Sequence, residues 1–250
     1  MRDVNGFTLD FDNLIKEREL SSQKRIEKLQ NGLIAIDRIN IVKQEMSKNF
    51  LYTAISKYSA DFSINDIFND YNQAVLFAFE SWDGFWKLKD RDGKEYDQYI
   101  LSAYDEMLWM LSLGYLLNIP NDTFKLLADI IDRDKVKDNL FEFIISAKLK
   151  DRQPIKEESY RDYFGIPETF AKLREAIKET DKAKAEKFVK EFITKDWFKK
   201  HKDTGWYNSH KSKHNVYFGY WSFEAAAIVK IMGLDDISFR ECQYYPKDLL

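Results

Sequence analysis

The sequence has few of the residues that interrupt or cross-link a chain. Its 250 residues include one cysteine, four prolines and nine glycines. The single cysteine, Cys242, excludes an internal disulfide framework and any metal site built from several cysteines. We interpret Cys242 as a small packed residue near the C-terminus. The scarcity of glycine and proline favours long regular elements.

The sequence also lacks a membrane span and an excess of positive charge. No apolar run reaches the roughly 20 residues that cross a bilayer. The formal net charge is -3, which gives no overall basic field for nucleic acid or an anionic membrane. The N-terminal region carries Asp3, Asp10 and Asp12 and lacks the basic and then apolar order of a signal peptide. We therefore expect a folded cytoplasmic protein without direct contact to nucleic acid or membrane.

Apolar residues recur at helical spacing, and no stretch shows sustained alternation with a period of two. The clearest sets are Ile26, Leu29, Leu33, Ile36, then Ile67, Ala74, Val75, Ala78, Phe79, Trp82, and later Phe170, Leu173, Ile177. Pro167 fits a first helical turn, Gly233 fits the position after a helix, and Ser63, Asn121 and Asp235 fit N-caps. The sequence predicts an all-α fold, a multi-helix globular bundle.

Two segments predict a helix-turn-helix unit that is used twice. Residues 116–124 and 231–239 have similar patterns, and each is predicted to follow an apolar helix and to open a new one. The polar stretch 150–158 contains one proline and is predicted to be a connector. It divides the chain into two helical halves, residues 1–150 and 151–250.

Charge is distributed unevenly along the chain. Residues 61–142 hold 17 acidic and 8 basic side chains, whereas residues 178–214 hold 11 lysines and 6 acidic side chains. Such runs are typical of the solvated faces of amphipathic helices. Alternatively, the acidic stretch forms a surface for a basic partner, because complementary potentials speed encounter and reject wrong partners.

Motifs of enzymatic chemistry are weak. The sequence has no glycine-rich phosphate loop, no GxSxG elbow and no set of kinase motifs. His210 and His214 would share one face of a helix, and Glu224 could complete a metal site of two histidines and one carboxylate. However, Lys211 and Lys213 favour a solvated loop there. We predict no enzymatic activity and no cofactor, with this metal site as the enzyme alternative.

The last 45 residues are the most specific part of the chain. A helix is predicted to begin near Val216, with Tyr217, Tyr220, Trp221, Glu224, Ile228 and Ile231 along one stripe. Three alanines, 225–227, permit close approach of a neighbouring helix. Glu224 needs a partner among these aromatics, and we expect a tyrosine hydroxyl, backbone amides, His210 or His214. Trp206 is expected either to pack the preceding loop or to anchor a partner.

These residues resemble a known family. The runs YFGYWSFEAAAI (217–228), LDD (234–236) and YYPKD (244–248) resemble the C-terminal region of the PoNi immunity proteins, which protect bacteria from PoNe-type DNase toxins. Residues 55–61 and the helices through Ala147 are similar to the N-terminal region of that family. The residues of the structural motif are Trp206, His210, Tyr217, Tyr220, Trp221, Glu224, Asp235, Asp236, Tyr244, Tyr245, Pro246 and Asp248.

The resemblance implies an all-helical, non-enzymatic protein that binds its cognate toxin in the cytoplasm. Toxins of this kind are delivered between competing bacteria by secretion systems. A DNase presents a basic cleft to phosphates, so carboxylates held on helices could occupy that cleft. The predicted contact residues are Glu80, Asp83, Asp90, Asp92, Asp97, Asp105 and Glu106. Occlusion of the active site and binding elsewhere on the toxin both remain open, as does a general helical scaffold that binds a peptide or a partner helix.

Overall fold

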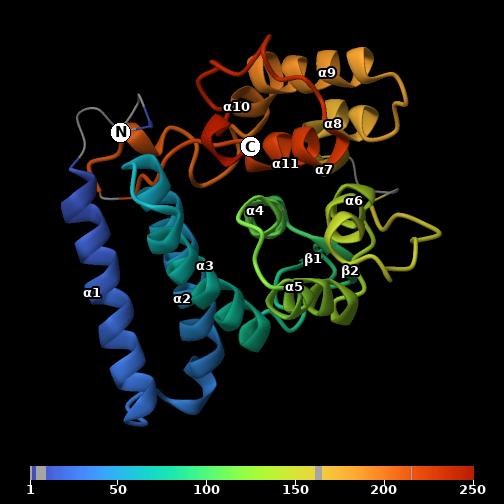
Figure 1. Cartoon of the computed structure of the whole chain (residues 1–250). Helices are drawn as coiled ribbons and strands as arrows, with labels where there is room; N and C mark the ends of the chain where they lie inside the picture. Colours follow the sequence, from blue (N-terminus) through green and yellow to red (C-terminus); the bar gives the residue numbers. More distant parts are fainter. Residues whose placement is uncertain (1, 4–9, 161–164, 215) are drawn as a thin grey trace. The chain divides into compact units, whose positions relative to one another are not determined.

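The computed structural model describes residues 2–3, 10–160, 165–214 and 216–250. Helices predominate, which confirms the predicted fold class (Figure 1). The chain forms two compact units: unit 1 comprises Met1–Asp83 and Asn208–Tyr220, and unit 2 comprises Gly84–Tyr207 and Trp221–Leu250. Residues on both sides of position 150 belong to unit 2, and the division into halves there stays a prediction. No helix within the described ranges is long and apolar enough to cross a membrane.

Unit 1 is built on three long helices, α1 (Phe11–Gln30), α2 (Ile39–Ser59) and α3 (Ile64–Ser81). Short 3-10 helices, η2 (Ile36–Arg38) and η4 (Ser209–Lys211), complete it. The chain descends along α1 and returns along α2, which packs against both other helices (Figure 1). Ser63 caps α3 as predicted, because its hydroxyl accepts the backbone N–H of Asp66 at 3.3 Å.

Unit 2 is built around α4 (Leu101–Leu116), of whose 16 residues 13 are buried. A helix buried on most sides is mostly apolar, and α4 departs from this only at a few polar side chains such as Asp105 and Glu106. The other helices of the unit are α5 (Asn121–Arg133), α6 (Asn139–Lys148), α7 (Gly165–Thr169), α8 (Ala171–Ala176), α9 (Lys182–Glu191), the π-helix η3 (Phe192–Asp196), α10 (Trp197–Lys200), α11 (Phe223–Met232) and the 3-10 helix η5 (Lys247–Leu249). The alanines of α11 pack against α4, as their small size predicts.

The predicted helix-turn-helix unit occurs only once in this form. Asn118, with φ 51°, follows α4, and α5 begins at Asn121 without a side-chain cap. Gly233, with φ 60°, ends α11 in the same left-handed conformation, but turns rather than a helix follow it. Asp235 instead accepts the N–H of Ile237 at 2.9 Å. The two segments therefore share the left-handed residue that ends a helix, and no more.

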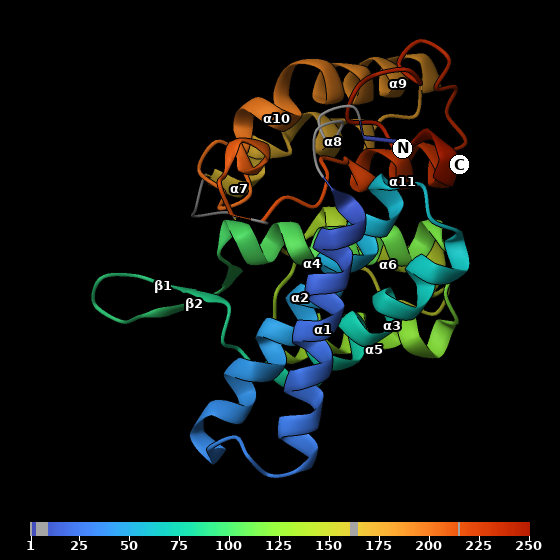
Figure 2. The same ribbon diagram turned by 90° about the vertical axis from the view of Figure 1, so that its left-hand side faces the viewer.

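A two-stranded hairpin interrupts the helices of unit 2. Strands β1 (Lys87–Lys89) and β2 (Glu95–Tyr99) pair antiparallel, with Lys87 opposite Tyr99 and Lys89 opposite Glu95. Its loop extends away from the helices of its own unit (Figure 2). No strand was predicted here, although the pair Asp92-Gly93 is of a kind common in hairpin turns.

Candidate functional site

The seven predicted contact residues divide between the two units. Glu80 and Asp83 lie in unit 1, and the other five lie in unit 2. Glu80, Asp83, Asp92 and Asp97 are exposed, Asp90 is half-buried, and Asp105 and Glu106 are buried, with 1% and 5% of their surface exposed. A buried side chain reaches a partner only after rearrangement. The four exposed residues are therefore the ones available for contact.

Asp90 shapes the loop of the hairpin. Its Oδ1 accepts the backbone N–H groups of Asp92 at 3.0 Å and Lys94 at 2.9 Å, and its Oδ2 accepts the hydroxyl of Tyr96 at 2.9 Å. Desolvation by itself would raise the pKa of Asp90, but these hydrogen bonds together lower it below its ordinary value. The carboxylate of Asp90 is thus occupied by its own loop.

The hairpin is not strongly acidic as a whole. Lys87 Nζ lies 2.7 Å from Asp97 Oδ1 and 2.9 Å from Glu95 Oε1. Residues 87–99 contain four acidic and four basic side chains. Six other carboxylates of the acidic stretch 61–142 are buried: Asp70, Asp105, Glu106, Asp134, Asp138 and Glu142. Much of the negative charge counted in the sequence is therefore neutralised or hidden from solvent.

Asp105 belongs to a buried cluster within unit 2. Its Oδ2 accepts the indole N–H of Trp206 at 3.2 Å, and its Oδ1 lies 3.3 Å from His201 Nε2. His201 Nδ1 lies 2.5 Å from the carbonyl oxygen of Trp197. Both ring nitrogens of His201 face acceptors, so the imidazolium form satisfies both. Burial by itself would lower the pKa of His201, but Asp105 raises it above its ordinary value.

Glu224 is fully buried near the start of α11. Its Oε1 accepts the indole N–H of Trp197 at 2.6 Å and the hydroxyl of Ser222 at 2.8 Å. Burial raises the pKa of Glu224 to about 7, although the charge of His201 opposes this shift. Of the expected partners, a backbone amide is confirmed, since the carboxylate bonds to the N–H of Glu224 itself, whereas a tyrosine hydroxyl, His210 and His214 were wrong. Trp197 is distant in sequence, and no spacing pattern identified it.

The predicted start of the last helix near Val216 was also wrong, because residues 216–222 have no regular secondary structure and α11 begins at Phe223. Gly219 has φ 112°, a conformation that residues with side chains rarely adopt. The carbonyl of Tyr217 accepts a bond from Arg18 Nη2 at 3.0 Å, and the carbonyl of Phe218 accepts one from Ser59 Oγ at 2.9 Å. Side chains from α1 and α2 thus replace the hydrogen bonds that a helix would provide.

The alternative metal site is not formed. His210 Nδ1 lies 2.8 Å from the hydroxyl of Tyr220, whereas His214 is exposed beyond the end of η4. The two histidines therefore do not share one helix face with each other. Among the described residues, no group of three or more histidine, cysteine, aspartate or glutamate side chains could hold a metal ion.

The remaining motif residues mostly form scaffold. The carbonyl of Tyr244 accepts the N–H of Ser222 at 2.8 Å. The ring centroid of Tyr244 lies 5.0 Å from that of Trp197. Both carboxylate oxygens of Asp236 accept hydrogen bonds from Arg240 Nη1, Oδ1 at 3.0 Å and Oδ2 at 2.8 Å. Trp206, Trp221, Tyr245 and Pro246 are buried, while Asp235 and Asp248 are exposed. The packing role expected for Trp206 is the one it has.

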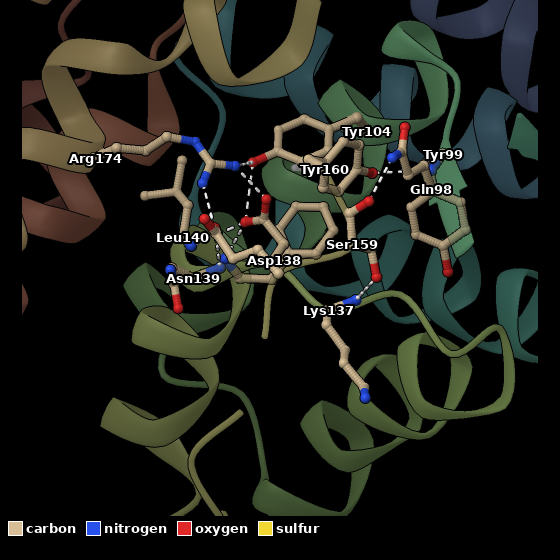
Figure 3. A network of polar contacts seen from close by, with 12 residues as sticks. Gln98, Tyr99, Tyr104, Lys137, Asp138, Asn139, Leu140, Ser159, Tyr160 and Arg174 are labelled. Carbon is tan, nitrogen blue, oxygen red and sulfur yellow. Dashed lines mark hydrogen bonds and ion pairs between the residues drawn. The ribbon is translucent and has the colours of Figure 1, made fainter. Parts of the chain in front are cut away.

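A buried ionic network, not anticipated from sequence, joins helices of unit 2 (Figure 3). Arg174 on α8 bonds to Asp138, to the hydroxyl of Tyr104 at 3.3 Å, and to Glu158 at 2.5 Å. Asp138 also caps α6 by accepting two backbone N–H groups. Burial alone would lower the pKa of Arg174, but Tyr104, Asp138 and Glu158 raise it above its ordinary value.

The same region fixes the chain directly after the predicted connector (Figure 3). The carbonyl of Ser159 accepts the side-chain amide of Gln98, and its hydroxyl accepts the N–H of Lys137 at 2.9 Å. The hydroxyl of Tyr160 accepts the N–H of Tyr99 at 2.8 Å. These bonds attach Ser159 and Tyr160, which directly follow the connector 150–158, to β2 and to the segment before α6.

Unit 2 also has a surface pocket of about 750 Å³ beside the base of the hairpin. Its apolar lining comes from Leu88, Ile100, Leu101 and Ile166, and its charged lining from Glu168, Lys199, Lys200, Lys202 and Asp203. None of the described residues that line it is a histidine or a cysteine. The pocket therefore offers no imidazole base and no thiol nucleophile.

Over most of its length, the chain resembles the crystal structure of protein PA2201 from Pseudomonas aeruginosa, with a TM-score of 0.63 and 14% sequence identity. That similarity covers 96% of this chain and 86% of PA2201, and it concerns the fold. No curated protein matches the chain. Residues 8–129 match the N-terminal region and residues 136–249 the C-terminal region of the PoNe immunity proteins (PoNi). The chain therefore belongs to the PoNe immunity protein family.

Proposed function

We propose that this protein neutralises a cognate DNase toxin by binding it directly in the cytoplasm of the cell that it protects. The match to both family regions, which together span nearly the whole chain, carries this proposal, since the family implies immunity to a toxin. Inhibition by binding requires no catalytic residues. It requires a stable scaffold and an exposed surface complementary to the toxin.

The proposed electrostatic contact residues are Glu80 and Asp83 of unit 1 and Asp92 and Asp97 of unit 2. All four side chains are exposed. Glu80 pairs with Lys43 at 2.6 Å and Asp97 with Lys87 at 2.7 Å, so these two would exchange partners on binding. Asp92 has no side-chain ion pair within the described residues. Asp90 keeps its role in the loop, and Asp105 and Glu106 leave the contact set because they are buried.

The basic surface of a nuclease explains why carboxylates would serve this function. A DNase binds phosphates with lysine and arginine side chains, and carboxylates on another protein can compete for them. Complementary charge raises the association rate. Added salt screens this attraction and therefore lowers the rate again. This mechanism covers the cleft of the toxin and prevents DNA from binding.

Co-expression in bacteria with the nuclease toxin encoded beside this gene tests the proposal. The expected result is survival of the cells and recovery of a stable complex. Cell death, together with no complex at micromolar concentrations, would reject the proposed function for that toxin.

Charge reversal tests the contact residues separately. The double variant Asp83→Lys/Asp92→Lys should weaken toxin binding about tenfold at low salt and flatten the salt dependence of the association rate. Asp151→Lys is the matched control, because Asp151 is exposed and is not among the proposed contact residues. Equal association rates for both variants and the wild type at low salt would remove these residues from the mechanism.

A further inference from the structure

The turn between α1 and α2 exposes large apolar side chains. Leu33 is 71% exposed and Ile36 is 89% exposed, while Ala35 beside them is also exposed. The helical spacing of Ile26, Leu29, Leu33 and Ile36 predicts one continuous stripe, but α1 ends at Gln30. The last two members of the stripe therefore fall on the turn and on η2, where no core covers them.

Hydrogen bonds fix the backbone of this turn. The N–H of Leu33 bonds to the carbonyl of Lys28 at 2.9 Å, and the N–H of Gly32 bonds to the carbonyl of Leu29 at 3.2 Å. Gly32 has φ 63°, so these bonds form a Schellman motif that ends α1. The backbone of the turn is therefore already ordered before binding, which lowers the entropy that binding costs.

The apolar contact that usually accompanies this motif is missing. In a Schellman motif, the residue after the glycine commonly packs against an apolar residue at the third position from the helix end. Here that position is Lys28, and Leu33 stays exposed. The apolar side chain of Leu33 therefore has no function in the capping of its own helix.

The charge around the turn is opposite to that of the whole chain. Residues 24–43 contain five basic and two acidic side chains, whereas the chain has a net charge of -3. Lys24, Lys28 and Arg38 are exposed, and none of them forms an ion pair within the described residues. An exposed apolar turn that is flanked in sequence by unpaired cations fits an apolar pocket with carboxylates at its rim.

We infer that the α1–α2 turn is a second contact region for the toxin: Leu33 and Ile36 enter an apolar pocket, and Lys28 and Arg38 pair with carboxylates around it. The identity of the partner rests on the proposed function, and the chemistry of the contact rests on the turn itself. Buried apolar anchors within a ring of polar contacts are the arrangement that concentrates binding energy in protein interfaces.

The double variant Leu33→Ala/Ile36→Ala tests this inference against the purified toxin. Its affinity should fall about 30-fold, the effect of losing one interface hot spot, with an unchanged melting temperature because both side chains are exposed. Ile237→Ala is the matched control, since Ile237 lies in unit 2 and is 78% exposed. This variant should bind the toxin like the wild type. Arg38→Glu should weaken toxin binding more at low salt than at high salt.

Three results would overturn the inference and leave the proposed function intact. Equal affinity of the double variant and the wild type for the toxin would exclude the turn from the interface. Loss of a wild-type dimer in the double variant, with unchanged toxin affinity, would assign the turn to self-association. Binding of the wild type but not the variant to vesicles of anionic lipid, again with unchanged toxin affinity, would assign it to a membrane surface. A wild-type protein that does not bind the toxin at all would instead reject the proposed function.

Discussion

Arg174 shows how single buried charges hold unit 2 together. Its partners come from α4, from the cap of α6 and from the connector before residue 159. A sequence pattern cannot reveal such a residue, because an arginine on an amphipathic helix is usually exposed. The partners lie 16 to 70 positions away in sequence, so only the folded chain brings them together.

Replacement of Arg174 by leucine should destabilise the protein by about 3–5 kcal/mol, since it leaves Asp138 buried and without its cation. Urea unfolding measures the change. The additional replacement Asp138→Asn should recover part of the loss, because asparagine can still cap α6. Lys137→Ala, at an exposed position, is the control and should stay near the wild type. A loss no larger than that of the control would contradict the structural role of Arg174.

The buried carboxyl of Glu224 should make the stability of the protein depend on pH. Its folded pKa of about 7 lies above the value in the unfolded chain, so its contribution to stability is complete below about pH 4.5 and is lost as the pH rises through 7. The raised pKa of His201 acts in the same direction above pH 6.5. The free energy of unfolding of the wild type, relative to Glu224→Gln, should fall by about 3 kcal/mol between pH 4.5 and 8.

Chemical denaturation at several pH values measures this difference. Glutamine keeps an oxygen to accept bonds from Trp197 and Ser222 but does not ionise, so it isolates the titration of Glu224. A difference between the two proteins that stays constant with pH would show that Glu224 does not titrate in this range.

At the scale of elements, the sequence predicted the helices well and the irregular segments poorly. The apolar set from Ile67 to Trp82 predicted α3, whereas the set from Ile26 to Ile36 ran beyond the end of α1 at Gln30. The irregular segment 216–222 was predicted as helix because its aromatic residues also recur at intervals of three and four positions. What decides the outcome there is Gly219 and the donors from α1 and α2, which sequence spacing does not reveal.

Arg18 is the residue that tests how this segment is held. It is buried and donates bonds to the carbonyls of Tyr52 and Tyr217 and to the hydroxyl of Ser56. Burial lowers the pKa of Arg18 to about 10, which leaves it charged at neutral pH. Arg18→Met should cost about 3 kcal/mol, because two buried carbonyls lose a charged donor.

Limited digestion with trypsin gives a second measure of the same change. The adjoining Lys211 and Lys213 are exposed cleavage sites, and release of the irregular segment should make them faster to cut in Arg18→Met. Lys16→Ala is the control, since Lys16 lies on the exposed face of the same helix. Unchanged cleavage at both sites would contradict the role of Arg18.

At the scale of the whole molecule, the fold class and family were predictable and the contact surface only partly so. The C-terminal runs identified the family because they combine several rare residues at fixed spacing. The same residues turned out to be mostly buried, so the recognisable part of the chain is its scaffold. The acidic count overestimated the available surface, since burial and ion pairs depend on the folded structure.

If the protein inhibits a nuclease by binding it, as proposed, titration of purified toxin with purified protein should abolish DNA cleavage. DNA cleavage by the toxin should fall linearly with added protein and end at one equivalent or another fixed stoichiometry, with the residual activity unchanged by further excess. Undiminished cleavage in the presence of a large molar excess of the protein would contradict the proposal.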